Sequence, residues 1–252
     1  MDLLLEGKVA IIAGGSRGIG RAVALGLAEE GCRLVIGARD PDRLAETAAQ
    51  ISALGGQVVT VPGDLSRPEA CSRLVDAALE AYGRVDILVN SVHASLPGEG
   101  EEVWRRGLEL LLMVPLRLIE LVVPPMREAG GGVIINLASI WGREAGGYPA
   151  YNAAKAALIS STKALATSLA SDGIRVVAVA PGSIAHPGGT WWRRQLEDPL
   201  GMARFVRESI PWGRFGTAEE VANVVVFLCS PRAAWVTGAC IVVDGCQSRS
   251  NI

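Results

Sequence analysis

The 252-residue sequence has few of the residues that bind metals or build disulfide frameworks. Its two histidines, His93 and His186, are far apart, so a histidine-rich metal site is not expected. The five cysteines are an odd number and include no C-x-x-C pair. This usage favours a reduced, cytoplasmic protein with free thiols over a disulfide scaffold.

An excess of charge of one sign is also missing. Lys plus Arg (24) nearly balance Asp plus Glu (26), and the formal net charge is −2. The composition therefore gives no reason to expect a nucleic-acid or anionic-membrane partner. No apolar run approaches the ~20 residues of a membrane-spanning helix, and the acidic start lacks the basic residues of a secretory signal. Half of the residues are hydrophobic, which is enough for a sizeable core.

Short apolar runs alternate with longer amphipathic segments along the whole chain. The runs are rich in Val and Ile without clean polar alternation, which is typical of strands covered on both faces. This alternation predicts one domain over residues 1–252, an α/β Rossmann-type doubly wound parallel sheet of about seven strands with helices on both faces. The predicted strands are 8–13, 33–37, 57–61, 86–90, 132–137, 175–179 and 239–243, and the predicted helices are 19–30, 42–54, 68–82, 101–127, 151–172 and 218–230.

Two features interrupt this pattern. Pro115 lies inside the predicted helix 101–127 and indicates a kink or an irregular turn. The segment 183–216 has no clear periodicity and contains three of the six tryptophans. A stretch of this length in a compact domain is expected to be a functional loop or a substrate lid.

A glycine-rich turn of the form G-x-x-x-G-x-G follows the first predicted strand and precedes a helix. At such a helix start, free N–H groups and the helix dipole favour a pyrophosphate. An ordinary flexible turn is the alternative, but the strand–glycine–helix context favours a dinucleotide site. The residues predicted to contact the cofactor here are Gly14, Ser16, Arg17, Gly18, Ile19 and Gly20.

Charges after the second predicted strand favour NADP(H) over NAD(H). An acidic residue usually holds the ribose 2′-hydroxyl at this place. Here Arg39 comes first, and Asp40 precedes Pro41, so capping the next helix is the expected role of Asp40. Arg39 and Arg17 would hold a 2′-phosphate by charge-assisted hydrogen bonds, although two solvated arginines are the alternative. Further cofactor contacts are expected where the third and fourth strands end, at Asp64, Leu65, Asn90 and Ser91.

Tyr151 and Lys155 are four residues apart at the start of a predicted helix, on one face. A phenol with a pKa of ~10 is a poor acid at pH 7, and lowering that value to ~7 takes about 4 kcal/mol. One ammonium at ~4 Å in an effective dielectric of ~20 supplies about that much. We therefore expect Lys155 to tune Tyr151 as an acid/base. Ser139, just after the buried run 132–137, is expected to donate a hydrogen bond to a substrate carbonyl oxygen.

These motifs resemble the short-chain dehydrogenase/reductase family over nearly the whole chain, with the strongest similarity to its 3-oxoacyl-carrier-protein reductase-like members. The matching pieces are Gly14-x-x-x-Gly18-x-Gly20, Asp64-Leu65, Asn90, Ser139, Tyr151-x-x-x-Lys155, Pro181-Gly182 and Val243-Asp244-Gly245. The resemblance implies an NAD(H) or NADP(H) cofactor, Tyr151 as the acid/base, Lys155 lowering its pKa and binding the ribose, and Ser139 positioning the carbonyl. It also implies a homotetramer or homodimer and cofactor contacts at Pro181, Gly182 and Ile184.

Three positions depart from that family's pattern. Its Asn-Asn-Ala-Gly after the fourth strand is here Asn90-Ser91-Val92-His93, which brings His93 to the site. The helix asparagine that holds a relay water in the family is replaced by Leu111, which is expected to slow or reroute proton supply without removing hydride transfer. The threonine after Pro-Gly-x-Ile is His186, so one contact to the nicotinamide carboxamide is missing.

Candidate substrate contacts are His93, Trp141 and Trp191, although a plain loop histidine and a lid that merely packs on the domain are the alternatives. The sequence thus predicts an NADP(H)-dependent carbonyl reductase, reversibly an alcohol dehydrogenase, with a small-molecule substrate. A catalytically weakened NADP(H)-binding regulatory or scaffold protein is the alternative, motivated by His93, Leu111 and His186. A third possibility keeps the cofactor but carries out a net non-redox reaction such as epimerisation.

Overall fold

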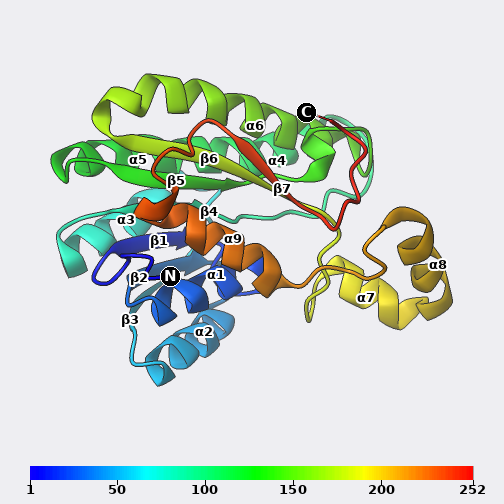
Figure 1. Cartoon of the computed structure of the whole chain (residues 1–252), viewed down its shortest axis with the longest axis horizontal. Helices are drawn as coiled ribbons and strands as arrows, with labels where there is room; N and C mark the ends of the chain where they lie inside the picture. The colour runs from blue at the N-terminus through cyan, green and yellow to red at the C-terminus, as the bar shows by residue number, and fades with distance from the viewer. Residues whose placement is uncertain (252) are drawn as a thin grey trace.

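The computed structural model describes residues 1–251 and is built around one parallel sheet (Figure 1). Its seven parallel strands have the order β3-β2-β1-β4-β5-β6-β7, so successive strands are added in one direction up to β3 and in the opposite direction from β4 onwards. The predicted doubly wound, Rossmann-type sheet is therefore confirmed. The strands are β1 Val9–Ala13, β2 Arg33–Ala38, β3 Gln57–Pro62, β4 Ile87–Asn90, β5 Gly132–Leu137, β6 Ile174–Pro181 and β7 Cys240–Val243.

Helices cover both faces of the sheet (Figure 1). One face carries α1 Gly18–Glu29 and α9 Ala218–Cys229, which pack on each other, with α2 Pro41–Ala53 beside α1. The other face carries α3 Pro68–Tyr82, α5 Val114–Glu128 and α6 Pro149–Leu169. Short 3₁₀ turns lie at Ile140–Gly142, Ala170–Asp172 and Pro231–Ala233.

Strand β1 shows why the strand sequences are continuous apolar runs. Its side chains alternate between the two faces, with Val9 and Ile11 in the core under α3 and α5, and Ala10 and Ile12 in the core under α1 and α9. All of them are fully buried. A strand covered on both faces gains ~1.5–3 kcal/mol for each large apolar side chain at every position, so no polar alternation is left in the sequence.

The predicted helix 101–127 is interrupted, as Pro115 indicated. It consists of α4 Glu101–Leu108, a π-helical turn over Glu109–Met113, and α5. Pro115 itself lies in the first turn of α5, directly after the π-helical turn, and lacks the N–H that would bond to the preceding turn. The irregular turn therefore comes before the proline.

The segment 183–216 is not an irregular loop throughout, because it contains α7 Thr190–Glu197 and α8 Pro199–Ser209. Neither helix has a fully buried residue, and the two pack mainly on each other, with Trp191 of α7 stacked on Phe205 of α8. Both project from one end of the molecule (Figure 1). The chain returns to the sheet through Thr217, which forms a capping box with Glu220 at the start of α9.

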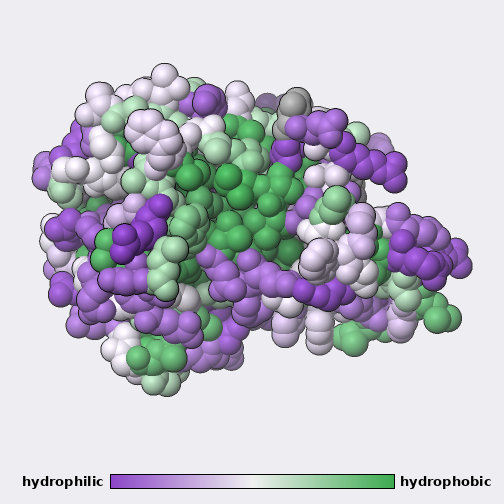
Figure 2. All heavy atoms as spheres, in the orientation of Figure 1, coloured by the Kyte–Doolittle hydropathy of each residue, from purple (hydrophilic) through white to green (hydrophobic). Residues whose placement is uncertain are grey.

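Strand β7 forms one edge of the sheet and is only partly covered. Figure 2 shows apolar atoms gathered on the surface around it. Within residues 1–251, no helix combines the length and apolar character needed to cross a membrane. The cysteines are free thiols, as predicted: Cys32, Cys71 and Cys229 are buried, Cys240 is half-buried and Cys246 is exposed.

Asp86 links the amino-terminal ends of the neighbouring strands β1 and β4. Its carboxylate accepts hydrogen bonds from the Val9 N–H at 3.0 Å and from Arg84 at 2.6 and 2.9 Å, and Lys8 lies at 3.4 Å. Burial by itself raises the pKa of Asp86, but these donors and positive charges together hold it below its ordinary value. A carboxyl whose pKa is lower in the folded state stabilises the fold above its unfolded pKa, and this stabilisation is lost as the pH falls through the folded pKa.

We expect Asp86→Asn to lower the free energy of unfolding by about 2 kcal/mol at pH 7, because buried donors lose a charged partner. The difference from the unsubstituted protein should shrink as the pH falls towards ~3. Urea unfolding at both pH values measures it, with Asp76→Asn, at an exposed position on α3, as the control. A loss of equal size at both pH values would contradict the assigned role.

Candidate active site

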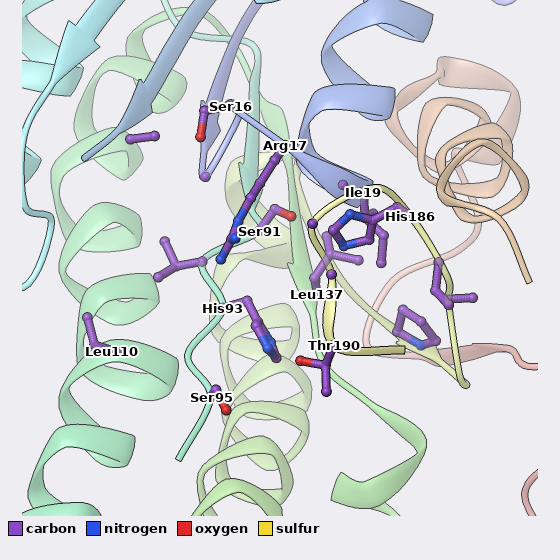
Figure 3. A pocket seen from close by; sticks show the side chains of 18 of the residues that line it. Ser16, Arg17, Ile19, Ser91, His93, Ser95, Leu110, Leu137, His186 and Thr190 are labelled. Atoms are coloured by element: carbon purple, nitrogen blue, oxygen red, sulfur yellow. The ribbon is translucent and has the colours of Figure 1, made fainter. Parts of the chain in front are cut away.

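The carboxyl ends of the central strands open into a cleft of about 600 Å³ (Figure 3). The cleft lies where the strand order reverses, which is the usual ligand position in open α/β sheets. Most of the predicted site residues line it, namely Gly14, Ser16, Arg17, Gly18, Ile19, Arg39, Asp64, Leu65, Ser91, His93, Ser139, Tyr151, Lys155, Pro181, Gly182, Ile184 and Trp191.

Three predicted residues lie behind the cleft lining rather than in it. Gly20 packs against the loop, since a Cβ there would overlap the carbonyl oxygen of Gly14. Asn90 is buried and donates a hydrogen bond to the Asn136 side chain at 2.9 Å, which fastens β4 to β5 beneath the site. Trp141 contacts other aromatic rings instead, as described below. Lining residues that the sequence analysis missed are Ala38, Asp40, Arg43, Gly63, Val92, Ser95, Leu110, Leu137, Ala138, Gly188, Gly189, Thr190 and Arg193.

The glycine loop forms a cradle that fits a phosphate. Gly14 has a φ of +91°, and a Cβ there would lie 2.5 Å from the carbonyl oxygen of Ser91. Gly18 has a φ of +54°, and its Cβ would meet the His186 ring at 2.6 Å. Helix α1 begins at this loop with no side-chain cap and no acidic residue in its first turn. Its first N–H groups therefore remain available to an anion.

Four arginines, Arg17, Arg39, Arg43 and Arg193, line the cleft beyond the glycine loop. Figure 3 shows Arg17 reaching from this loop across the cleft. Burial, and then the positive charges of Arg43, Arg39 and Arg193, lower the pKa of Arg17, opposed by Asp40. Asp40 caps α2, as predicted, and pairs with Arg43 at 3.2 Å. The remaining positive charge suits a further phosphate.

Ser139, Tyr151 and Lys155 meet on the other side of the cleft. Ser139 follows β5, and Tyr151 and Lys155 lie on one face of the first turns of α6. The Ser139 side chain lies close enough to the Tyr151 hydroxyl to lower the pKa of that phenol. The buried Lys155 donates to the carbonyl oxygen of Leu137 at 2.5 Å, and its Nζ lies 5.8 Å from the centre of the Tyr151 ring. The three groups thus form one cluster.

The charge states of this cluster differ from the sequence expectation. Burial raises the pKa of Tyr151 to about 12, although the Ser139 side chain lowers it, and burial lowers the pKa of Lys155 to about 7. The expected tuning of Tyr151 towards pH 7 is therefore not seen in the protein without its ligands, because desolvation is the largest influence on the Tyr151 pKa and Lys155 is not among the groups that lower it. Tyr151 is instead a protonated phenol at neutral pH, which is the form that donates a proton.

Aromatic rings surround Tyr151. His93 meets it edge to face, with ring centres 5.8 Å apart, and Trp141 does so at 6.2 Å. Trp141 also lies 6.4 Å from Trp191, which stacks on Phe205 of α8 at 4.7 Å. Of the three predicted substrate residues, His93 and Trp141 therefore contact the Tyr151 ring directly, and Trp191 is joined to it through Trp141.

The other two positions that depart from the family pattern, Leu111 and His186, lie in different places: one is in the protein core and the other is at the glycine loop. Leu111, in the π-helical turn, is fully buried in an apolar cluster that packs against Tyr151. His186 lies over the glycine loop near Ile19 (Figure 3), and its Nδ1 is 3.1 Å from the carbonyl oxygen of Pro187. No group of three or more His, Cys, Asp or Glu side chains in the described part of the chain is arranged to hold a metal ion.

Comparison with known proteins agrees with this architecture. A family model described as enoyl-(acyl carrier protein) reductase matches residues 13–246. The chain is 35% identical over 246 residues to 3-oxoacyl-(acyl-carrier-protein) reductase FabG of Thermotoga maritima, covering 96% of this chain and 98% of that protein.

Solved structures show the same similarity. L-sorbose reductase from Gluconobacter frateurii, complexed with NADPH and L-sorbose, has a TM-score of 0.92 and 38% identity, covering 99% of this chain and 100% of that chain. A 7α-hydroxysteroid dehydrogenase complexed with NADH and 7-oxo glycochenodeoxycholic acid has a TM-score of 0.91 and 30% identity, covering 99% and 97%. The chain belongs to the short-chain dehydrogenase/reductase family, and it is an oxidoreductase of that family, as its motifs predicted.

Proposed function

We propose that this oxidoreductase transfers a hydride between NADP(H) and the carbonyl carbon of a small ketone or aldehyde, reversibly a secondary or primary alcohol. The observation that carries the proposal is the meeting of Ser139, Tyr151 and Lys155 in the same cleft as the glycine cradle. Bound NADPH supplies the hydride and, after transfer, a positive nicotinamide ring.

The side chains of the cluster have complementary roles. Ser139 and Tyr151 are close enough to bond each other, so both can donate to one substrate oxygen. Tyr151 then gives its proton to that oxygen as negative charge develops there. The phenolate that remains is stabilised by the protonated form of Lys155, whose charge acts strongly because this side chain is itself buried. Lys155 also lines the cleft and is placed to donate to the cofactor ribose.

The arginines support NADPH over NADH. The similar structures contain NADPH in one case and NADH in the other, so the choice depends on this chain's own residues. Asp40, the only carboxylate next to Arg39 in sequence, is already engaged as a helix cap and with Arg43. Arg17 and Arg39 are left to hold a 2′-phosphate, with Arg193 contributed by α7.

The segment 183–216 is proposed to act as the substrate lid. Its helix α7 brings Trp191 and Thr190 to the cleft, and Trp191 is anchored by stacking on Phe205. We also propose that the chain forms a homodimer or homotetramer. The partly open edge at β7, with its apolar surface (Figure 2), supports a self-contact.

The proposed function is tested by mixing the purified chain with NADPH and a panel of aldehydes and ketones. We expect NADPH oxidation to keep pace with alcohol formation for at least one compound. Tight NADPH binding without turnover of any compound would favour the alternative of a regulatory or scaffold protein. Conversion of a substrate without net change in NADPH would favour a non-redox reaction such as epimerisation.

A further inference from the structure

We propose that His93 is the proton shuttle of this site and passes protons between water in the cleft and the hydroxyl of Tyr151. The inference rests on the proposed function, because it assumes that Tyr151 gives its proton to the substrate. Tyr151 must regain a proton in every turnover, and the question is which route that proton takes.

The side of Tyr151 away from the cleft is closed to protons. An apolar cluster packs there, and it offers no group that accepts or donates a proton. Lys155 is 3% exposed, and its one hydrogen bond within residues 1–251 goes to a main-chain carbonyl oxygen, that of Leu137. Within residues 1–251, no side-chain hydrogen bond therefore connects Lys155 with the surface on the side away from the cleft. The members of the apolar cluster are Ala94, Leu96, Leu111, Ala150 and Ala154.

The cleft side of Tyr151 is occupied by His93. Its ring lies edge to face on the Tyr151 ring and is reached by water from the cleft. Neither ring nitrogen of His93 has a hydrogen-bond partner within the described residues, so both are free to exchange protons with cleft water. Once cofactor and substrate displace water from around Tyr151, this imidazole is the titratable group that still connects the hydroxyl with solvent.

The charges that face His93 keep it neutral between turnovers. The surrounding cleft walls, and then the positive charges of Lys155 on α6, Arg17 on the glycine loop and His186 on the segment after β6, lower the pKa of His93 below its ordinary value. A neutral imidazole has one donor and one acceptor nitrogen, which allows it to release a proton on one side while taking one up on the other.

The proton balance of the step is complete without a further reactant. In carbonyl reduction, the O–H bond of Tyr151 breaks and its proton joins the substrate oxygen. The N–H proton of His93 moves through one cleft water to the phenolate oxygen while the opposite ring nitrogen takes one proton from solvent water, so the ring stays neutral throughout. Proton exchange with cleft water then restores the starting tautomer. One proton is taken up per turnover, no electrons move through His93, and alcohol oxidation reverses each step.

The test compares His93→Gln with the unsubstituted enzyme and with Glu99→Gln, an exposed change on the same loop. We expect His93→Gln to lower steady-state kcat about 100-fold, whereas the first turnover of pre-bound NADPH stays within about three-fold, because Tyr151 starts protonated. The trace should show a burst of one NADPH oxidised per site. Free imidazole should restore steady-state kcat, and Glu99→Gln should change neither phase.

Three outcomes would overturn the shuttle. An unchanged kcat would leave His93 without a role in proton transfer. A first turnover as slow as the steady state, with a raised KM, would make His93 a substrate contact. Loss of kcat that imidazole does not restore would make its role structural. If the unsubstituted enzyme reduces no carbonyl at all, the proposed function fails together with the shuttle, whereas an active enzyme with an unaffected His93→Gln variant rejects the shuttle alone.

Discussion

Replacing Tyr151 by Phe is expected to lower kcat for carbonyl reduction by about 10³-fold, while the Kd for NADPH stays within about two-fold. The substitution removes one oxygen atom and keeps the ring that packs between His93 and Trp141. The substrate oxygen then lacks its proton donor, and Ser139 alone cannot replace it, because a serine hydroxyl is a far weaker acid than a phenol. Steady-state kinetics and fluorescence titration of NADPH measure the two effects separately.

Tyr148→Phe is the matched control for this experiment. Tyr148 lies three residues earlier, immediately before α6, and its side chain is exposed away from the cleft lining. It should leave kcat unchanged. A Tyr151→Phe variant that kept most of its activity would refute the role assigned to Tyr151, because no other phenol lines the cleft within the described residues.

Replacing both Arg17 and Arg39 by Ala is expected to raise the Kd for NADPH about 10³-fold and the Kd for NADH less than ten-fold. A charge-assisted hydrogen bond contributes about 1.5–3 kcal/mol, and each arginine provides at least one to the 2′-phosphate that only NADPH carries. Arg43 is neutralised by Asp40 and should not compensate fully. Titration of both cofactors against the variant gives the two constants.

Arg33→Ala serves as the control, since Arg33 is exposed at the amino end of β2, opposite the cleft. It should change neither constant. If the double variant weakened NADPH and NADH by the same factor, the arginines would be acting on the shared pyrophosphate or on folding, and the proposed preference for NADPH would be wrong.

The sheet was predictable because each of its central strands is marked by its own short stretch of apolar residues. Strands buried on both faces must be apolar at nearly every position, and β1 and β5 illustrate this directly. The helices α7 and α8 were not predictable in the same way. They are only 8 and 11 residues long and bury no residue completely, so few apolar positions mark them in the sequence, and a helix cap such as Asp198 is a weak signal alone.

The same distinction between local and long-range information applies to the candidate site. Residues within one strand–turn–helix unit, such as Gly14 and Gly18, were predicted because their spacing is fixed by the turn that they form. Arg43 and Arg193 were missed because they reach the cleft from separate helices, and only the fold brings them together. The high pKa of Tyr151 was also missed, since residue spacing gives the distance to Lys155 but not the extent to which both groups are desolvated.

The most direct test of the account follows a labelled hydride. The enzyme is given NADPH carrying deuterium at C4 of the nicotinamide and a carbonyl compound, and the product alcohol is analysed by mass spectrometry and NMR. The account predicts one deuterium on the former carbonyl carbon for each NADPH oxidised when the label is on the transferred face. Alcohol that contains no deuterium with either face labelled, or a converted substrate with intact NADPH, would contradict it.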